Sequence, residues 1–141
     1  MIEKIEFQGD LFAIIVRREF SQPGVTFFTP ADLSQQLAYM KHPVGKKIEP
    51  HVHNPVLREV SYTQEVLIIQ RGRLRVDFYN CKKEYLCSRE LQAGDVVLLS
   101  KGGHGFNVLE EVEMFEVKQG PYAGEEDKTR FSGVTEKDVS A

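Results

Sequence analysis

Residues 73–91 read RLRVDFYNCKKEYLCSREL, and this stretch decides the fold class. From Leu74 to Phe78 the apolar side chains alternate with polar ones, which is the two-residue period of a half-buried strand. The polar run Asn80–Lys83 then breaks the pattern like a hairpin turn, and Glu84–Leu91 returns as a second strand. The stretch therefore predicts an antiparallel β-hairpin.

Further strand patterns lie on both sides of this hairpin. Short strands separated by glycine-bearing turns favour a sandwich or a closed barrel over a βαβ sheet. Two of the strands are apolar on both faces, so we expect a second sheet or a partner subunit to cover the face outside the barrel. The predicted strands are Leu11–Arg17, Glu65–Ile69, Val96–Leu99 and Val112–Val117, with a turn at Gln92–Asp95.

One short helix is expected at Pro30–Met40. Leu33, Leu37 and Met40 fall on one helical face, and Thr29 is a candidate N-cap before a proline at the first helical position.

Composition restricts the class of protein. A chain of 141 residues with 41% hydrophobic residues suits a single globular domain, and a formal charge of −3 without a lysine or arginine run argues against nucleic acid as a partner. The apolar runs are too short to span a membrane. The charged beginning of the chain does not resemble a signal peptide. We therefore expect a cytoplasmic protein in which Cys81 and Cys87 are reduced.

The candidate chemistry begins at residues 49–54, which read EPHVHN. In a strand, His51 and His53 point to the same face, about 6.6 Å apart along the chain. Both imidazoles can then converge on one metal ion. Glu65 opens an otherwise apolar strand, where a carboxylate facing a barrel interior is costly unless it is paired or ligated.

These residues resemble the two motifs of the cupin family. Gly45, the pair His51 and His53, Glu65 and Gly72 follow the order of the first motif. The second motif is matched by GDVVLLSKGGHGFN, residues 94–107, which contains His104 and Asn107.

The resemblance implies an all-β fold of the cupin type, a double-stranded β-helix or jelly-roll barrel with one or two short helices. It makes His51, His53, Glu65 and His104 the four candidate ligands of one divalent transition metal ion per chain, which is Zn, Fe, Mn, Ni or Cu. The motifs lie at 45–107. Because the sequence has no internal repeat or linker, we expect one domain over residues 1–131, and the low apolar content of residues 132–141 predicts a disordered tail.

The chain departs from the family pattern in two places. Eleven residues separate His53 from Glu65, where the family usually has three or four. The second motif is one residue short before its histidine and has Ser100 where proline is common. The insertion contains Glu59, an alternative carboxylate ligand, but the six-residue gap to Gly72 favours Glu65.

Two functions follow from the resemblance. In the first, the chain is a metal-dependent enzyme, of isomerase, epimerase or dioxygenase type, that acts on a small polar substrate such as a sugar or an oxygen-rich acid. Glu59 and Tyr62, in an insertion expected to form a rim or lid, are then the candidate catalytic residues. In the second, it is a non-catalytic module that binds a small molecule or carbohydrate, with a structural metal or none. The strands that are apolar on both faces also predict a homodimer.

Overall fold

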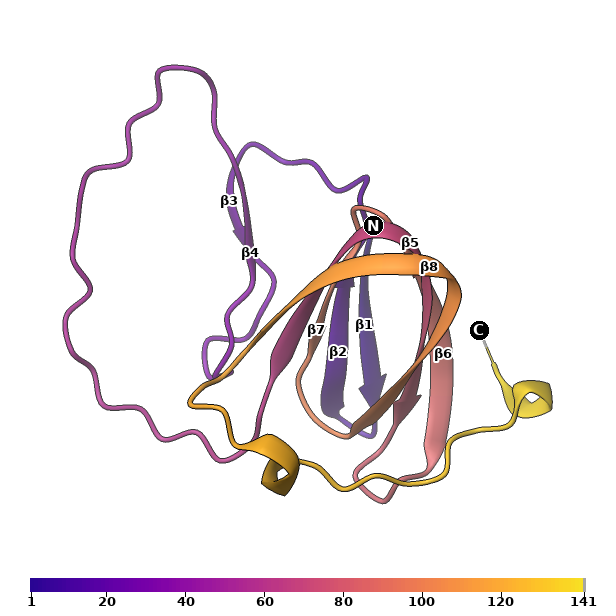
Figure 1. The fold of residues 1–141 in the computed structure, drawn as a ribbon. Coiled ribbons are helices and arrows are strands. Elements are labelled where there is room, and N and C mark those ends of the chain that lie inside the picture. Colours follow the sequence, from indigo (N-terminus) through magenta and orange to yellow (C-terminus); the bar gives the residue numbers. More distant parts are fainter. Residues whose placement is uncertain (141) are drawn as a thin grey trace.

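The computed structural model describes residues 1–140, and Ala141 lies outside the described residues. Within that range the chain folds into strands joined by turns, with two short 3-10 helices near its end (Figure 1). The strands are β1 (Ile2–Phe7), β2 (Asp10–Val16), β3 (Gly24–Phe27), β4 (Ala38–Lys41), β5 (Glu65–Tyr79), β6 (Tyr85–Gln92), β7 (Val96–Leu99) and β8 (Gly103–Lys118). The 3-10 helices are η1 (Gly124–Asp127) and η2 (Glu136–Asp138).

Six of the strands form one antiparallel sheet in the order β1-β2-β7-β5-β6, and β8 pairs with the other edge of β5. The sheet curls into a half-barrel, and β8 is a strongly curved strand that crosses over it (Figure 1). The prediction of an all-β, barrel-like fold is confirmed.

The strand predicted at Glu65–Ile69 and the first strand of the predicted hairpin form one long strand, β5. Its first half pairs with β7 and its second half with β6, while β8 follows both halves on the opposite edge. The β5–β8 pairing shifts register at several points between Ile69 and Leu74, and such bulges bend a strand pair. Gly72 lies in this bend with a φ of +88°, and a Cβ there would lie 1.9 Å from the carbonyl oxygen of Glu111. Only glycine fits this crossing.

The concave face of the half-barrel holds the main core. Leu67, Ile69, Leu74, Val76 and Phe78 of β5 are buried there, so the alternation read from the sequence faces inward. They pack against buried side chains of β1, β2, β6 and β7, namely Ile5, Phe12, Ala13, Ile15, Leu91, Val97 and Leu99. Removing this apolar surface from water is the main driving force for the curled sheet.

The outer face of β2 and β7 is covered as well. Ile14, Val16 and Phe28 form a second buried cluster, against which Leu37 and Tyr39 pack. These last residues lie beside or in the two-stranded sheet of β3 and β4. Of the two covers expected for such a face, a second sheet or a partner subunit, the structure shows the small β3–β4 sheet over β2 and Val96, while Ile68 of β5 is 38% exposed.

The helix predicted at Pro30–Met40 is wrong. Ala38–Lys41 is the strand β4, paired with β3, and the residues before it form turns. Thr29 Oγ1 accepts the amide N–H of Leu37 at 3.2 Å, so Thr29 closes the base of a loop and does not cap a helix. Strand pairing and burial on β2 outweigh a weak helical pattern.

The segment expected to be a disordered tail lies against β5 and β6. Arg75, whose side chain is 9% exposed, donates to Asp77 Oδ1 at 2.8 Å and to Glu136 Oε2 at 2.6 Å. The amide N–H of Ser88 donates to the carbonyl oxygen of Ser140 at 2.7 Å. In the structure, residues 132–140 are thus held by a buried arginine and by the edge of β6.

Among the described residues, no helix has the length and apolar character needed to cross a membrane.

Candidate functional site

A cavity of about 1200 Å³ lies where the two ends of β5 and β8 come together. The segment from Glu126 to Gly133 forms part of its wall. The lining residues that matter for the chemistry are Tyr62, Glu65, Tyr79, His104, Glu116 and Phe131.

Two of the four candidate metal ligands meet in this cavity. Glu65 is the first residue of β5 and pairs across the sheet with Lys118, whereas His104 pairs with Phe78 near the other end of β5. The curl of the strand pair brings the two side chains together, with His104 Nε2 2.7 Å from Glu65 Oε1. The two side chains are 28% and 13% exposed, so the pair is largely shielded from water.

The charges at this pair are set by its neighbours. The hydrogen bond from His104 lowers the pKa of Glu65 to about 2, although burial acts in the opposite direction. The pKa of Glu116 is raised, chiefly because its carboxyl group shares a hydrogen bond with Glu65 and also because it is partly buried. Glu65 is therefore the ionised member of the two acids, and Glu116 is the member that holds a proton more readily.

His51 and His53 lie elsewhere, in residues 42–64, which we call the histidine arm. These residues form no strand or helix, so the strand expected around the two histidines is not present there. The arm extends away from the half-barrel as a wide loop (Figure 1). The two imidazole rings face each other edge-on with centroids 5.2 Å apart, and both residues are exposed.

The four candidate ligands thus form two pairs that are not brought together. Within residues 1–140, no group of three or more His, Cys, Asp or Glu side chains is close enough to hold a metal ion. The donor set itself, imidazoles with one carboxylate, has the chemistry that a transition metal requires. The cavity provides half of that set, and the arm carries the other half.

The candidate catalytic residues lie on the arm. Glu59 is exposed. Tyr62 lines the cavity, but its side chain is 82% exposed. Glu65, not Glu59, is the carboxylate beside His104.

Tyr79 is a lining residue that the alternation pattern did not indicate. A register shift between Phe78 and Tyr79 interrupts the pairing with β6, and Tyr79 is buried with only 4% of its surface exposed. Its ring packs edge-on against Phe131 at 5.0 Å, and its hydroxyl accepts the amide N–H of Val134 at 2.9 Å. A bulge of this kind leaves no mark in the polar–apolar pattern.

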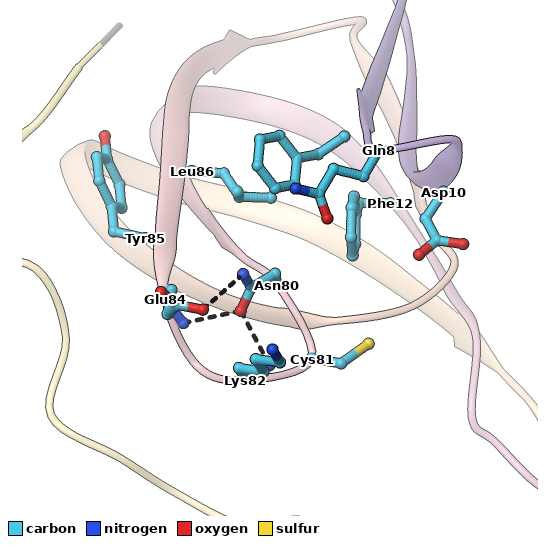
Figure 2. Close-up of a pocket in the computed structure, with 10 residues that line it drawn as sticks. Gln8, Asp10, Phe12, Asn80, Cys81, Lys82, Glu84, Tyr85 and Leu86 are labelled. Carbon is cyan, nitrogen blue, oxygen red and sulfur yellow. Dashed lines mark hydrogen bonds between the residues drawn. The ribbon is translucent and has the colours of Figure 1, made fainter.

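A smaller cavity of about 370 Å³ lies between the β1–β2 turn and the β5–β6 turn (Figure 2). Its polar groups stabilise the turns: Asn80 Oδ1 accepts the amide N–H groups of Lys82 and Glu84 at 2.9 and 3.0 Å. Asp10 is paired with Lys101 at 3.0 Å. The larger cavity therefore remains the candidate site.

Comparison with protein-family models, curated proteins and solved structures gives no match to this chain.

Proposed function

We propose that the chain is a metal-binding protein with the jelly-roll topology of the cupins, and that it is a metal-dependent enzyme acting on a small polar molecule. The observation that supports the proposal is the contact between Glu65 and His104 inside a large cavity. A carboxylate and an imidazole held side by side, with little exposure to water, are half of a four-ligand metal site.

In this proposal His51 and His53 of the histidine arm supply the other two ligands. The arm has no regular structure, and its 23 residues from 42 to 64 give it a long reach. When bound, the metal supplies a Lewis acid that polarises a carbonyl or hydroxyl group of the substrate.

The remaining lining residues suit an oxygen-rich substrate. The cavity is lined by the cations Lys101, Lys128 and Arg130 and by a similar number of acids, and Phe131 provides an apolar wall. Such a lining offers hydrogen-bond donors and acceptors to hydroxyl groups, and a cavity of this size holds a sugar or a small organic acid. Glu116 is the group best placed to hold a proton beside the substrate, while Tyr62 lies at the edge of the same cavity.

One observation favours a second function, a binding module that works without a metal. Because no three donor side chains meet within the described part of the chain, the cavity by itself offers a hydrogen-bonding pair and charged side chains of both signs. Such a site binds a small acid or sugar without any chemical step.

We also propose that the chain is a homodimer in the cytoplasm. Both cysteines are free thiols in the structure, as a reducing compartment requires.

Metal content separates the two functions. We expect one zinc or other transition metal ion per chain in the wild-type protein, measured by elemental analysis. His51→Ala and His53→Ala each lower that content severely, because each removes a ligand without disturbing the core. His42→Ala is the matched control, since His42 lies on the arm outside the motif. Wild-type protein that carries no metal after dialysis against Zn(II), Mn(II), Ni(II), Cu(II) and anaerobic Fe(II) salts, yet binds organic acids, would establish the second function.

A further inference from the structure

We propose that the histidine arm of one copy completes the cavity site of a second copy, by pairing as an added strand along the free edge of β8. The inference rests on the proposed function, since it states which chain supplies His51 and His53.

Residues 43–60 of the arm carry apolar side chains that their own barrel leaves uncovered. Leu57 is 94% exposed and Val52 is 84% exposed, and Figure 1 shows the arm standing off from the half-barrel beyond β3 and β4. Its exposed large hydrophobic side chains are Val44, Ile48, Val52, Val56, Leu57, Val60 and Tyr62. An apolar surface of this extent is typical of a segment that docks on another surface.

The strand β8 offers the complementary surface. Within residues 1–140 it pairs only with β5, so its other edge has unpaired N–H and C=O groups along a strand of 16 residues. Such an edge is a template for an added strand. Its exposed hydrophobic side chains are Phe106, Val108, Leu109, Met114, Phe115 and Val117.

Charge gives the arm a modest preference over a second β8 edge. The strand β8 carries four glutamates, of which Glu110 and Glu113 already pair with Arg73 and Arg71 of β5. Pairing the β8 edges of two copies with each other adds no arginine to these acids, whereas the arm carries three lysine and arginine side chains with two glutamates.

The pattern of the arm fits an added strand that completes the site. In an extended segment His51 and His53 share one face and Val52 takes the other, and Pro50 is tolerated on an edge strand. His104 is the second residue of β8 and contacts Glu65 in the cavity. A strand added beside this end of β8 can therefore present both arm histidines to the Glu65–His104 pair.

The proposed source of the arm is a second copy of the chain. Each copy leaves both the arm and the β8 edge uncovered. When two copies exchange arms, the arm and the β8 edge of each copy are covered and a symmetric dimer results. Exchange of an identical element between protomers is a low-cost route to such a dimer.

Complementation between two defective chains tests the exchange. One chain carries His51→Ala and His53→Ala, and the other carries Glu65→Gln and His104→Gln. The two are co-expressed with different affinity tags, and the mixed dimer is purified by both tags in turn. After dialysis against zinc chloride, the bound zinc is measured. With exchanged arms, one of the two sites has all four ligands, so the mixed dimer holds half the zinc of the wild-type dimer. Each parent homodimer holds almost none.

The other outcomes separate this inference from the proposed function. Wild-type protein that fails to bind zinc, manganese, nickel, copper or iron overturns both. If the wild-type protein binds metal but the mixed dimer binds none, only the exchange is overturned, because each arm then supplies ligands to its own barrel. A metal-loaded wild-type protein that sediments as a monomer also overturns the exchange and leaves the proposed function intact. If the double variant in the cavity does not fold, as judged by circular dichroism, His104→Gln alone takes its place and keeps the Glu65 carboxylate.

Discussion

Glu65 and His104 belong to opposite ends of one strand pair, yet His104 Nε2 lies 2.7 Å from Glu65 Oε1. The contact exists because β5 and β8 bend together around Gly72 and the irregular pairing on either side of it. The geometry of the candidate site is therefore a consequence of the curl of the sheet. A substitution that changes the curl should also change the distance between Glu65 and His104.

Gly72→Ala should destabilise the protein strongly. The new Cβ would meet the backbone of Glu111 at 1.9 Å, in a left-handed conformation that alanine adopts only with strain. We expect a loss of about 3 kcal/mol or more in the free energy of unfolding, measured by urea titration. Gly9→Ala is the matched control: Gly9 has a φ of +81° and no atom within 4 Å of a Cβ, so the loss there should be about 1 kcal/mol. Equal losses in the two variants would contradict the role given to Gly72.

His104→Ala should destabilise the metal-free protein. The change removes the main hydrogen-bond donor to Glu65, whose side chain is only 13% exposed, and leaves its carboxylate the hydrogen bond shared with Glu116. The loss of such a donor to a largely buried ionised group costs about 1–3 kcal/mol. Urea unfolding in the presence of EDTA measures this loss. His42→Ala, on the histidine arm, should change the unfolding free energy by less than about 0.5 kcal/mol. A loss in the His104 variant no larger than that of the control would mean that the pair is not formed in solution.

Deleting residues 132–141 should expose the edge of β6. The Ser88 amide N–H donates to the carbonyl oxygen of Ser140 at 2.7 Å, so its hydrogen exchange should become faster when that acceptor is removed. Amides in the centre of β7 serve as the internal reference and should exchange as before. Unchanged exchange at Ser88 would support the sequence-based expectation of a disordered tail.

Acid should weaken the attachment of β1. Glu3 receives hydrogen bonds from Arg89 at 2.8 Å and from Arg17 at 2.7 Å, and chiefly the first lowers its pKa below the ordinary value of 4.5. Because the pKa is lower in the folded state, the stabilisation is present above about pH 4.5 and is lost as the pH falls through the folded value. Glu3→Gln should therefore lower stability at pH 7, with a difference that disappears in acid. Glu6→Gln, at an exposed position of the same strand, is the matched control. Thermal unfolding across the pH range measures both, and a difference that persists in acid would contradict this account.

The strands could be predicted from the sequence because alternation reports burial directly. The pattern from Leu74 to Phe78 faces the core as expected, and the turn at Gln92–Asp95 is closed by a hydrogen bond of 3.0 Å between its ends. The union of two predicted strands into β5 could not be predicted, since Gly72 in a bend and Gly72 in a loop look alike in the sequence. The helix at Pro30–Met40 was predicted wrongly because packing on β2 decides that segment.

The candidate site could be predicted only in part. Glu65 was singled out because a charge at the head of an apolar strand needs a partner, and the structure gives it His104. The motif that pairs His51 with His53 contains no information on where the arm lies. The burial of Tyr79 at the cavity depends on a bulge that the sequence does not reveal. The position of Glu116 depends on the cross-strand pairing that places it opposite Leu67, two residues from Glu65.

X-ray absorption at the metal edge of the loaded wild-type protein tests the central claim most directly. If the histidine arm and the cavity pair hold one ion, the spectrum shows three imidazole ligands and at least one oxygen ligand. Glu65→Gln then changes the oxygen shell, and the paired change of His51 and His53 to alanine removes two imidazoles. A spectrum with one imidazole or none, or one that these substitutions leave unchanged, would contradict the account.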